Sequence, residues 1–94
     1  MLIVTGSVTG RADSFERLKE ASLEHVHRSR TEPGCISHAV YADCENPLRL
    51  FFFEQWADRA ALDAHFRVPA TGEFARGLRS FASASDGPTI YETP

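Results

Sequence analysis

The sequence has 94 residues, of which 43% are hydrophobic and 24% are charged, and its formal net charge is −3 at pH 7. A chain of this length forms one domain, residues 1–94, whose small core would gain stability from a partner subunit. The negative charge and the scattered lysines and arginines argue against a protein that binds nucleic acid or a membrane surface.

The first third of the chain predicts a strand followed by a helix. The opening MLIVTGSVTG lacks the basic start and long apolar core of a secretion signal, so we expect a cytoplasmic protein. Residues 2–9 are apolar and β-branched, which is typical of a strand. Asp13 and Glu16 predict a capping box, and Pro33 with Gly34 ends the helix. The buried stripe of this helix is expected to hold Phe15, Leu18, Ser22 and Val26.

Two strands joined by a short loop follow. In CISHAVYAD, alternation places Ile36 with His38, Val40 and Ala42 on one face and Cys35 on the other. Both cysteines are assigned to this strand at odd spacing, so a disulfide between them is not expected. After the CENP turn, LRLFFFEQW places Phe52, Glu54 and Trp56 on one face and Phe51 and Phe53 on the opposite one.

The last third predicts helical segments and a closing strand. Asp58 is a good N-cap for RAALDAHF, and Pro69 interrupts or ends that helix before GEFARGLRSF resumes the spacing. A DGP turn then leads to the short strand TIYET. The order strand, helix, strand, strand, helix, strand is typical of the ferredoxin-like, split βαβ α+β fold, with helices on one face of an antiparallel sheet.

The second face of this sheet needs a partner. Leaving Phe51 and Phe53 in water would forfeit roughly 1.5–3 kcal/mol for each phenylalanine. A broad apolar sheet face usually marks an interface, so we expect a homodimer in which two copies pack sheet to sheet.

The central stretch resembles the antibiotic biosynthesis monooxygenase superfamily, the dimeric α+β barrel proteins. The matching motifs are EPGC, the acid-containing turn ADCENP, EQW at a strand end, ALDAH on the next helix, and Pro69 four residues after His65. The resemblance implies the fold, the dimer, and a pocket between sheet and helices. It also implies cofactor-independent oxygenation of anthrone-like or hydroquinone-like substrates as the best-known activity, with heme degradation and dione isomerisation in related branches.

The sequence departs from each of these better-known sites. Ser7 (or Gly6) and Leu78 stand where the heme-degrading branch has an asparagine and a heme-ligating histidine. Phe52 and Leu62 replace the asparagine and tyrosine of the polyketide oxygenases, whereas Trp56 and Arg76 match that site. Where many relatives carry a second histidine straight after the proline, this chain has Ala70.

Six residues are candidates for the site. Trp56 would stack on a flat substrate or serve as a core tryptophan. His65 is the best candidate base, or it fixes a helix end through a hydrogen bond. Arg76 would stabilise a substrate anion, or it is a solvated helix residue. Phe52 and Glu54 face the expected pocket; the Glu54 carboxylate is expected to be paired with an arginine rather than to be catalytic.

His38 is the sixth candidate, because it joins the pocket if its face meets the helices, although a satisfied core histidine is the more ordinary reading. His25 and His27 are expected at the surface or rim, and neither the histidines nor the cysteines have a spacing that predicts a metal site.

These residues favour a monooxygenase that needs no cofactor and takes molecular oxygen and a planar, electron-rich aromatic such as a hydroquinone, anthrone or polyketide. The alternatives are a non-catalytic dimer that binds a small aromatic and a heme-handling protein.

Overall fold

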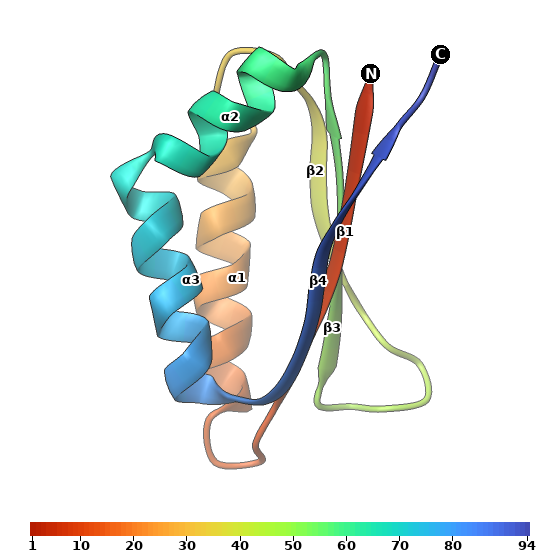
Figure 1. Ribbon diagram of the computed structural model, residues 1–94. Helices are drawn as coiled ribbons and strands as arrows, with labels where there is room; N and C mark the ends of the chain where they lie inside the picture. Colours follow the sequence, from red (N-terminus) through yellow and green to blue (C-terminus); the bar gives the residue numbers. More distant parts are fainter.

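The computed structural model describes all 94 residues and contains four strands and three helices (Figure 1). The elements are β1 (Leu2–Gly10), α1 (Phe15–Ser29), β2 (Cys35–Ala42), β3 (Arg49–Trp56), α2 (Arg59–Arg67), α3 (Pro69–Phe81) and β4 (Ala82–Glu92). None of the helices combines the length and the apolar character needed to cross a bilayer.

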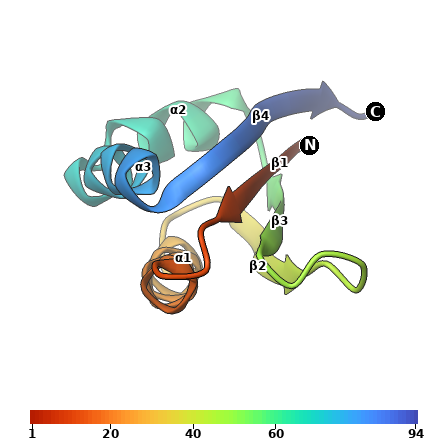
Figure 2. The ribbon, with the colours of Figure 1, turned by 90° about the horizontal axis from the view of Figure 1, so that it is seen from below.

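The strands form one antiparallel sheet in the order β2-β3-β1-β4. All three helices cover the same face of it, and the other face carries no helix (Figures 1 and 2). This arrangement confirms the predicted ferredoxin-like α+β fold. Because β1 and β3 lie in the middle of the sheet, side chains from their helix-facing sides reach the centre of the molecule.

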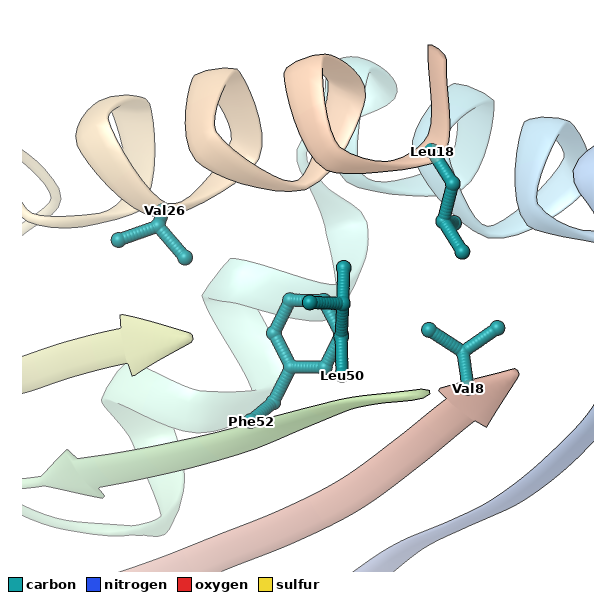
Figure 3. Close-up of a cluster of buried hydrophobic side chains, with 5 residues drawn as sticks. All are labelled: Val8, Leu18, Val26, Leu50 and Phe52. Carbon is teal, nitrogen blue, oxygen red and sulfur yellow. The ribbon is translucent and has the colours of Figure 1, made fainter. Parts of the chain in front are cut away.

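Strand β3 follows the predicted alternation. Leu50, Phe52, Glu54 and Trp56 are buried, and the residues between them are half-buried. Two apolar clusters result. One is formed by Val8, Leu18, Val26, Leu50 and Phe52 between α1 and the sheet (Figure 3). The other is formed by Leu2, Val4, Trp56 and Leu62 at the end of the sheet nearest α2.

The faces of β2 differ from the prediction at its start. Cys35 pairs with Trp56 but Ser37 pairs with Gln55, so Ile36 is an extra residue that reverses the alternation. Consequently Cys35 packs against the cluster of Trp56, whereas Ile36 is 55% exposed. Cys44 lies beyond the strand, and both cysteines are free thiols. The prediction that Ile36 shares a face with His38 and that Cys35 lies on the other face was therefore wrong.

The predicted capping box at the start of α1 was also wrong. The helix begins at Phe15 after Ser14, and no side chain caps it. Asp13 is exposed and lies 3.8 Å from Arg11 Nε instead. The Ser14 hydroxyl donates a hydrogen bond to the Phe81 carbonyl (2.8 Å), which ties the start of α1 to the end of α3.

The predicted helix cap at Asp58 is confirmed, since its carboxylate accepts a hydrogen bond from the Ala61 amide (2.8 Å). Pro69 does not simply end the helical region; it occupies the first turn of the separate helix α3, where its missing N–H has no helical partner to lose. Strand β4 is longer than predicted. It starts directly after α3, and the expected DGP turn is an irregularity within it, opposite Thr5 to Ser7 of β1.

Candidate active site

A cavity of about 340 Å³ lies between the helix-facing side of the sheet and helices α2 and α3. Phe52, Phe74 and Leu78 supply much of its apolar wall, and Phe52 and Phe74 meet edge to face with ring centres 5.9 Å apart. Its polar lining includes Glu54, Thr71, Arg79 and Asp86. The sheet positions Phe52 and Glu54 because residues two apart on a strand point to the same face.

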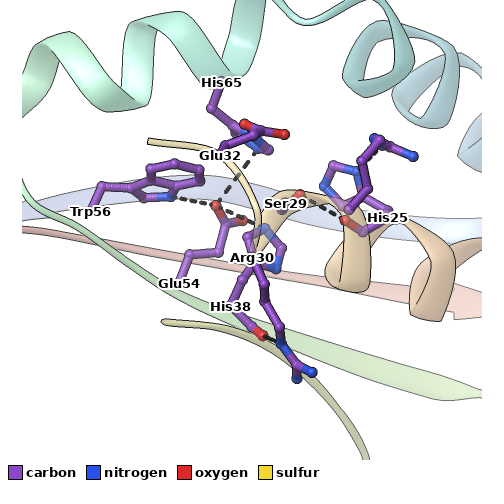
Figure 4. A network of polar contacts seen from close by, with 9 residues as sticks. His25, Ser29, Arg30, Glu32, His38, Glu54, Trp56 and His65 are labelled. Carbon is purple, nitrogen blue, oxygen red and sulfur yellow. Dashed lines mark hydrogen bonds and ion pairs between the residues drawn. The ribbon is translucent and has the colours of Figure 1, made fainter. Parts of the chain in front are cut away.

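Glu54 connects this cavity with a buried polar network (Figure 4). Its Oε1 atom accepts a hydrogen bond from the Trp56 indole N–H (2.9 Å) and lies 3.2 Å from His38 Nε2 and 3.9 Å from His65 Nε2. No arginine pairs with Glu54, so the predicted arginine partner was wrong. The carboxylate instead accepts a hydrogen bond from an indole and lies close to two imidazoles.

His65 lies at the end of α2 and is only 2% exposed. Its Nδ1 is 2.7 Å from Glu32 Oε1, a residue of the loop between α1 and β2. Glu32 and His65 also line a second depression, which shares no lining residue with the main cavity. Gly34 allows this approach, because a side chain there would collide with Ala61 of α2 and its backbone is left-handed (φ +82°).

His38 is a core histidine, but it is not a satisfied one. Its side chain is fully buried, and its contact with Glu54 lacks the alignment of a hydrogen bond, so neither ring nitrogen has a hydrogen-bond partner. Its backbone carbonyl accepts a hydrogen bond from Arg30 Nε (2.8 Å), which fastens β2 to the end of α1. A buried imidazole without partners is costly, so its position calls for an explanation.

His25 is the residue that the sequence analysis missed. It was expected at the surface or rim, but it is 4% exposed and stacks on Phe74 with ring centres 4.1 Å apart. Its ring also approaches those of His38 (5.2 Å) and His65 (5.4 Å). A signal for its burial existed, since Leu18, Ser22, His25 and Ser29 repeat at helical spacing. His27, in contrast, is exposed as expected.

Burial and charge set the protonation of this network. Burial, together with the neighbouring His38, His65 and Arg28, lowers the pKa of His25 to about 3, so the ring is neutral near pH 7. Burial alone would raise the pKa of Glu54, but His38, the Trp56 indole and His65 outweigh it and hold the pKa below its usual value. Glu54 is therefore a carboxylate near neutral pH.

The remaining predicted site residues lie at different distances from the cavity. Trp56 is completely buried and does not line it; its indole supports Glu54 from behind. Arg76 is exposed on α3, and its guanidinium lies near Gly72 rather than at the cavity wall. Arg79, three residues further along α3, does line the cavity. The structure thus brings together Glu54, His38, His65 and Trp56 and leaves Arg76 apart.

A family model described as antibiotic biosynthesis monooxygenase matches residues 1–77. The chain belongs to this family. The matched residues span β1 to the greater part of α3 and include Glu54, Trp56 and His65. Membership in the antibiotic biosynthesis monooxygenase family confirms the resemblance seen in the EPGC, EQW and ALDAH motifs.

Solved structures show the same fold at low sequence identity. The chain is 22% identical to a candidate antibiotic biosynthesis monooxygenase from Deinococcus radiodurans, with a TM-score of 0.94 over 100% of this chain and 93% of that one. It is 24% identical to a conserved protein from Methanosarcina mazei Go1, with a TM-score of 0.90 over 99% of this chain and 92% of that one.

A closer relative in sequence is an uncharacterised protein from Synechocystis sp., 40% identical over 73 residues. The match covers 78% of this chain but 50% of that protein, so the chain spans about half the length of the curated relative it matches.

Proposed function

We propose that this member of the antibiotic biosynthesis monooxygenase family oxygenates a planar, electron-rich aromatic of the hydroquinone, anthrone or polyketide type, without a dedicated cofactor. The observation that carries the proposal is the position of Glu54. Its carboxylate lines a largely apolar cavity and is linked on its other side to buried imidazoles. A cavity of about 340 Å³ suits a small aromatic ligand.

The proposed chemistry draws its electrons from the substrate. Ground-state oxygen is a triplet and reacts slowly with closed-shell molecules, but a deprotonated hydroquinone is electron-rich enough to reduce it. In the overall reaction, hydroquinone and O₂ give a hydroxyquinone and water: one oxygen atom enters the product, and the other leaves as water. The protein must supply a base, stabilise the anion and keep the site dry.

The polar network offers a path for the proton. Glu54 faces the cavity and would accept the proton from a substrate hydroxyl. His65 Nε2 lies 3.9 Å from that carboxylate, and its Nδ1 contacts Glu32, which lines the second depression. The 3.9 Å separation would shorten in the substrate complex, as catalytic hydrogen bonds often do. In this scheme Glu54 touches the substrate and His65 holds the proton that Glu54 passes on.

An arginine is proposed to stabilise the substrate anion, and helix α3 offers two candidates. Arg76 was the residue predicted from the resemblance, but Arg79 lines the cavity. Charge-assisted hydrogen bonds from a guanidinium would favour the phenolate over the phenol. We therefore expect Arg79→Gln to raise KM more than Arg76→Gln does, and the reverse order would assign the role to Arg76.

The first experiment measures oxygen uptake by chelator-treated protein with reduced naphthoquinone and with anthrone, against blanks without enzyme. Uptake above autoxidation is expected, with one atom of ¹⁸O₂ in the product. Glu54→Gln keeps the shape but removes the base, so kcat should fall about 10²–10⁴-fold. The matched control is Glu73→Gln, which makes the same change at an exposed position on α3. Equal rates for the two variants would contradict the role of Glu54.

A second candidate function is a dimer that binds a small aromatic without turning it over. It is favoured by the burial of His65 and Trp56, neither of which lines the cavity. In that case oxygen uptake would equal the blank across the panel, while the same aromatics would raise the Tm of the protein.

A further inference from the structure

We propose that His25, His38 and His65 form a binding site for a divalent first-row transition metal such as Zn²⁺, with Glu54 as the fourth ligand. The three histidines come from α1, β2 and α2, and each contributes a ring nitrogen within 4.8 Å of the other two. All three are buried, at 4%, 1% and 2% exposure. Imidazole is a preferred ligand of zinc, copper, iron and nickel in proteins.

The spacing of the rings already fits such an ion. With Zn–N bonds of about 2.0–2.1 Å and tetrahedral angles, the centres of three bound imidazoles lie about 5 Å apart. Here the separations are 5.2 Å for His25–His38, 5.4 Å for His25–His65 and 5.7 Å for His38–His65. The nitrogens lie within 4.8 Å of one another, whereas they would be about 3.3 Å apart around a tetrahedral ion. Binding therefore requires the rings to turn, with little movement of the backbone.

Two of the three histidines, His38 and His65, have a ring nitrogen available for an ion. His38 has no hydrogen-bond partner at either nitrogen, so a metal bond would satisfy a buried group that is otherwise orphaned. His65 uses Nδ1 for Glu32, which leaves Nε2 directed inward. A carboxylate on the outer nitrogen of a histidine is the usual support of a metal ligand, because it orients the ring and makes it more basic.

Glu54 completes the set and balances the charge. Its Oε1 lies 3.2 Å from His38 Nε2 and 3.9 Å from His65 Nε2, so it faces the same space as the rings. Two carboxylates, Glu54 and Glu32, flank the position of a doubly charged ion, which offsets the cost of burying that charge. Because Glu54 also lines the cavity, a metal bound here would lie next to the substrate.

Arg28 opposes metal binding at His25, and a variant that lacks its charge therefore provides a specific test of the site. Its guanidinium contacts His25 Nδ1 at 2.8 Å, which places the ring proton on Nε2, the nitrogen that must bind the ion. Loading therefore moves that proton to Nδ1 and displaces the guanidinium. Arg28→Gln should consequently bind Zn²⁺ more tightly than the wild-type protein, an effect that a purely structural histidine cluster would not produce.

The test is a Zn²⁺ titration of chelator-treated wild-type protein by calorimetry, with bound metal counted by mass spectrometry. The expected result is one ion per protomer. His25→Phe keeps the stacking on Phe74 but removes one metal ligand. His25→Phe and His38→Asn should each weaken Zn²⁺ binding by at least about 100-fold. His27→Ala, an exposed histidine two residues from His25, should bind as the wild type does.

Cobalt provides a readout that needs no variant. Co²⁺ added to the wild-type protein should give the intense visible bands of a four-coordinate ion, and Zn²⁺ should displace them. This measurement decides the case if His38→Asn does not fold. Substoichiometric Zn²⁺ binding, six-coordinate Co²⁺ spectra, or equal losses in His25→Phe and His27→Ala would each overturn the proposal.

The site goes beyond the proposed oxygenase function and shares Glu54 and His65 with it. An ion on His65 Nε2 would occupy the lone pair that accepts the proton, so Zn²⁺ should suppress the oxygen uptake of chelator-treated protein. The binding titration uses no substrate. A protein that binds Zn²⁺ but shows no uptake would therefore refute the oxygenase proposal alone, and uptake without Zn²⁺ binding would refute the metal site alone.

Discussion

His25 links a single buried side chain to the pH dependence of stability. Burial, His38, His65 and Arg28 lower the pKa of His25 from 6.5 to about 3 in the folded protein. In the unfolded chain the same ring returns to its ordinary pKa. Between pH 6.5 and about 3, the His25 ring is protonated in the unfolded chain and neutral in the folded protein. Lowering the pH in this range therefore favours unfolding.

We therefore expect the free energy of unfolding of metal-free protein to fall as pH drops from 6.5, by up to about 1.4 kcal/mol per pH unit through this residue. His25→Phe should remove this contribution, so the free energy of unfolding of the variant should change less with pH between 6.5 and 4.5. Above pH 4.5 carboxylates such as Glu54, whose pKa is also lowered, contribute little. Urea unfolding at several pH values measures the slopes. His27→Ala is the control, and parallel curves for wild type and His25→Phe would contradict the assignment.

At the scale of elements, the loop between α1 and β2 is pressed against α2. Gly34 has φ +82°, and a methyl group there would collide with the Cβ of Ala61. The Gly34 carbonyl accepts a hydrogen bond from the Ala57 amide (2.8 Å) just before α2. The same loop carries Glu32 to His65, so the close packing at Gly34 keeps these two side chains in contact.

Gly34→Ala should destabilise the protein by about 1–3 kcal/mol, because it adds backbone strain to a steric clash. Urea unfolding measures the loss. Ala61→Gly removes the atom that would be struck, so Gly34→Ala should cost less in the Ala61→Gly background than in the wild type. The remaining cost then reports the left-handed backbone alone. Equal costs in the two backgrounds would show that the helix does not press on the loop.

The sequence predicted correctly the elements whose form depends on residues close together in the chain. Alternation in β3 placed Phe52, Glu54 and Trp56 correctly, and the Asp58 cap was visible because its partner lies three residues away. The extra residue Ile36 was not predictable, since the register with β3 creates it. Nor was the start of α1, because Ser14 bonds to Phe81 at the far end of the chain.

The candidate site also has a part that the sequence predicted and a part that depends on packing between distant residues. Strand parity placed Glu54 on the helix-facing side from sequence alone, and the family motifs pointed to His65. For His38 the sequence left open whether its face meets the helices. The link between His65 and Glu32 depends on the packing of α2 against the loop, which no local pattern encodes. His25 was missed because the buried stripe of the helix was assigned to Phe15, Leu18, Ser22 and Val26, although His25 also lies on it.

For the whole molecule, the uncovered sheet face is the main unsatisfied surface. Phe51 and Phe53 of β3 remain half-buried in the single chain, and neighbouring Ile36 and Tyr41 are 55% and 56% exposed. The helices cover only the opposite face (Figure 2). A second copy placed sheet to sheet would remove these side chains from water by one symmetric contact.

We expect light scattering to give the mass of two 10.4 kDa chains for the wild type. Phe53→Glu places a charge at the centre of the proposed interface, where burying it without a partner is costly, so this variant should be monomeric. Leu23→Glu is the matched control, because Leu23 is 40% exposed on α1, in the layer away from the open sheet face. A dimer that survives Phe53→Glu but not Leu23→Glu would place the interface on the helices instead.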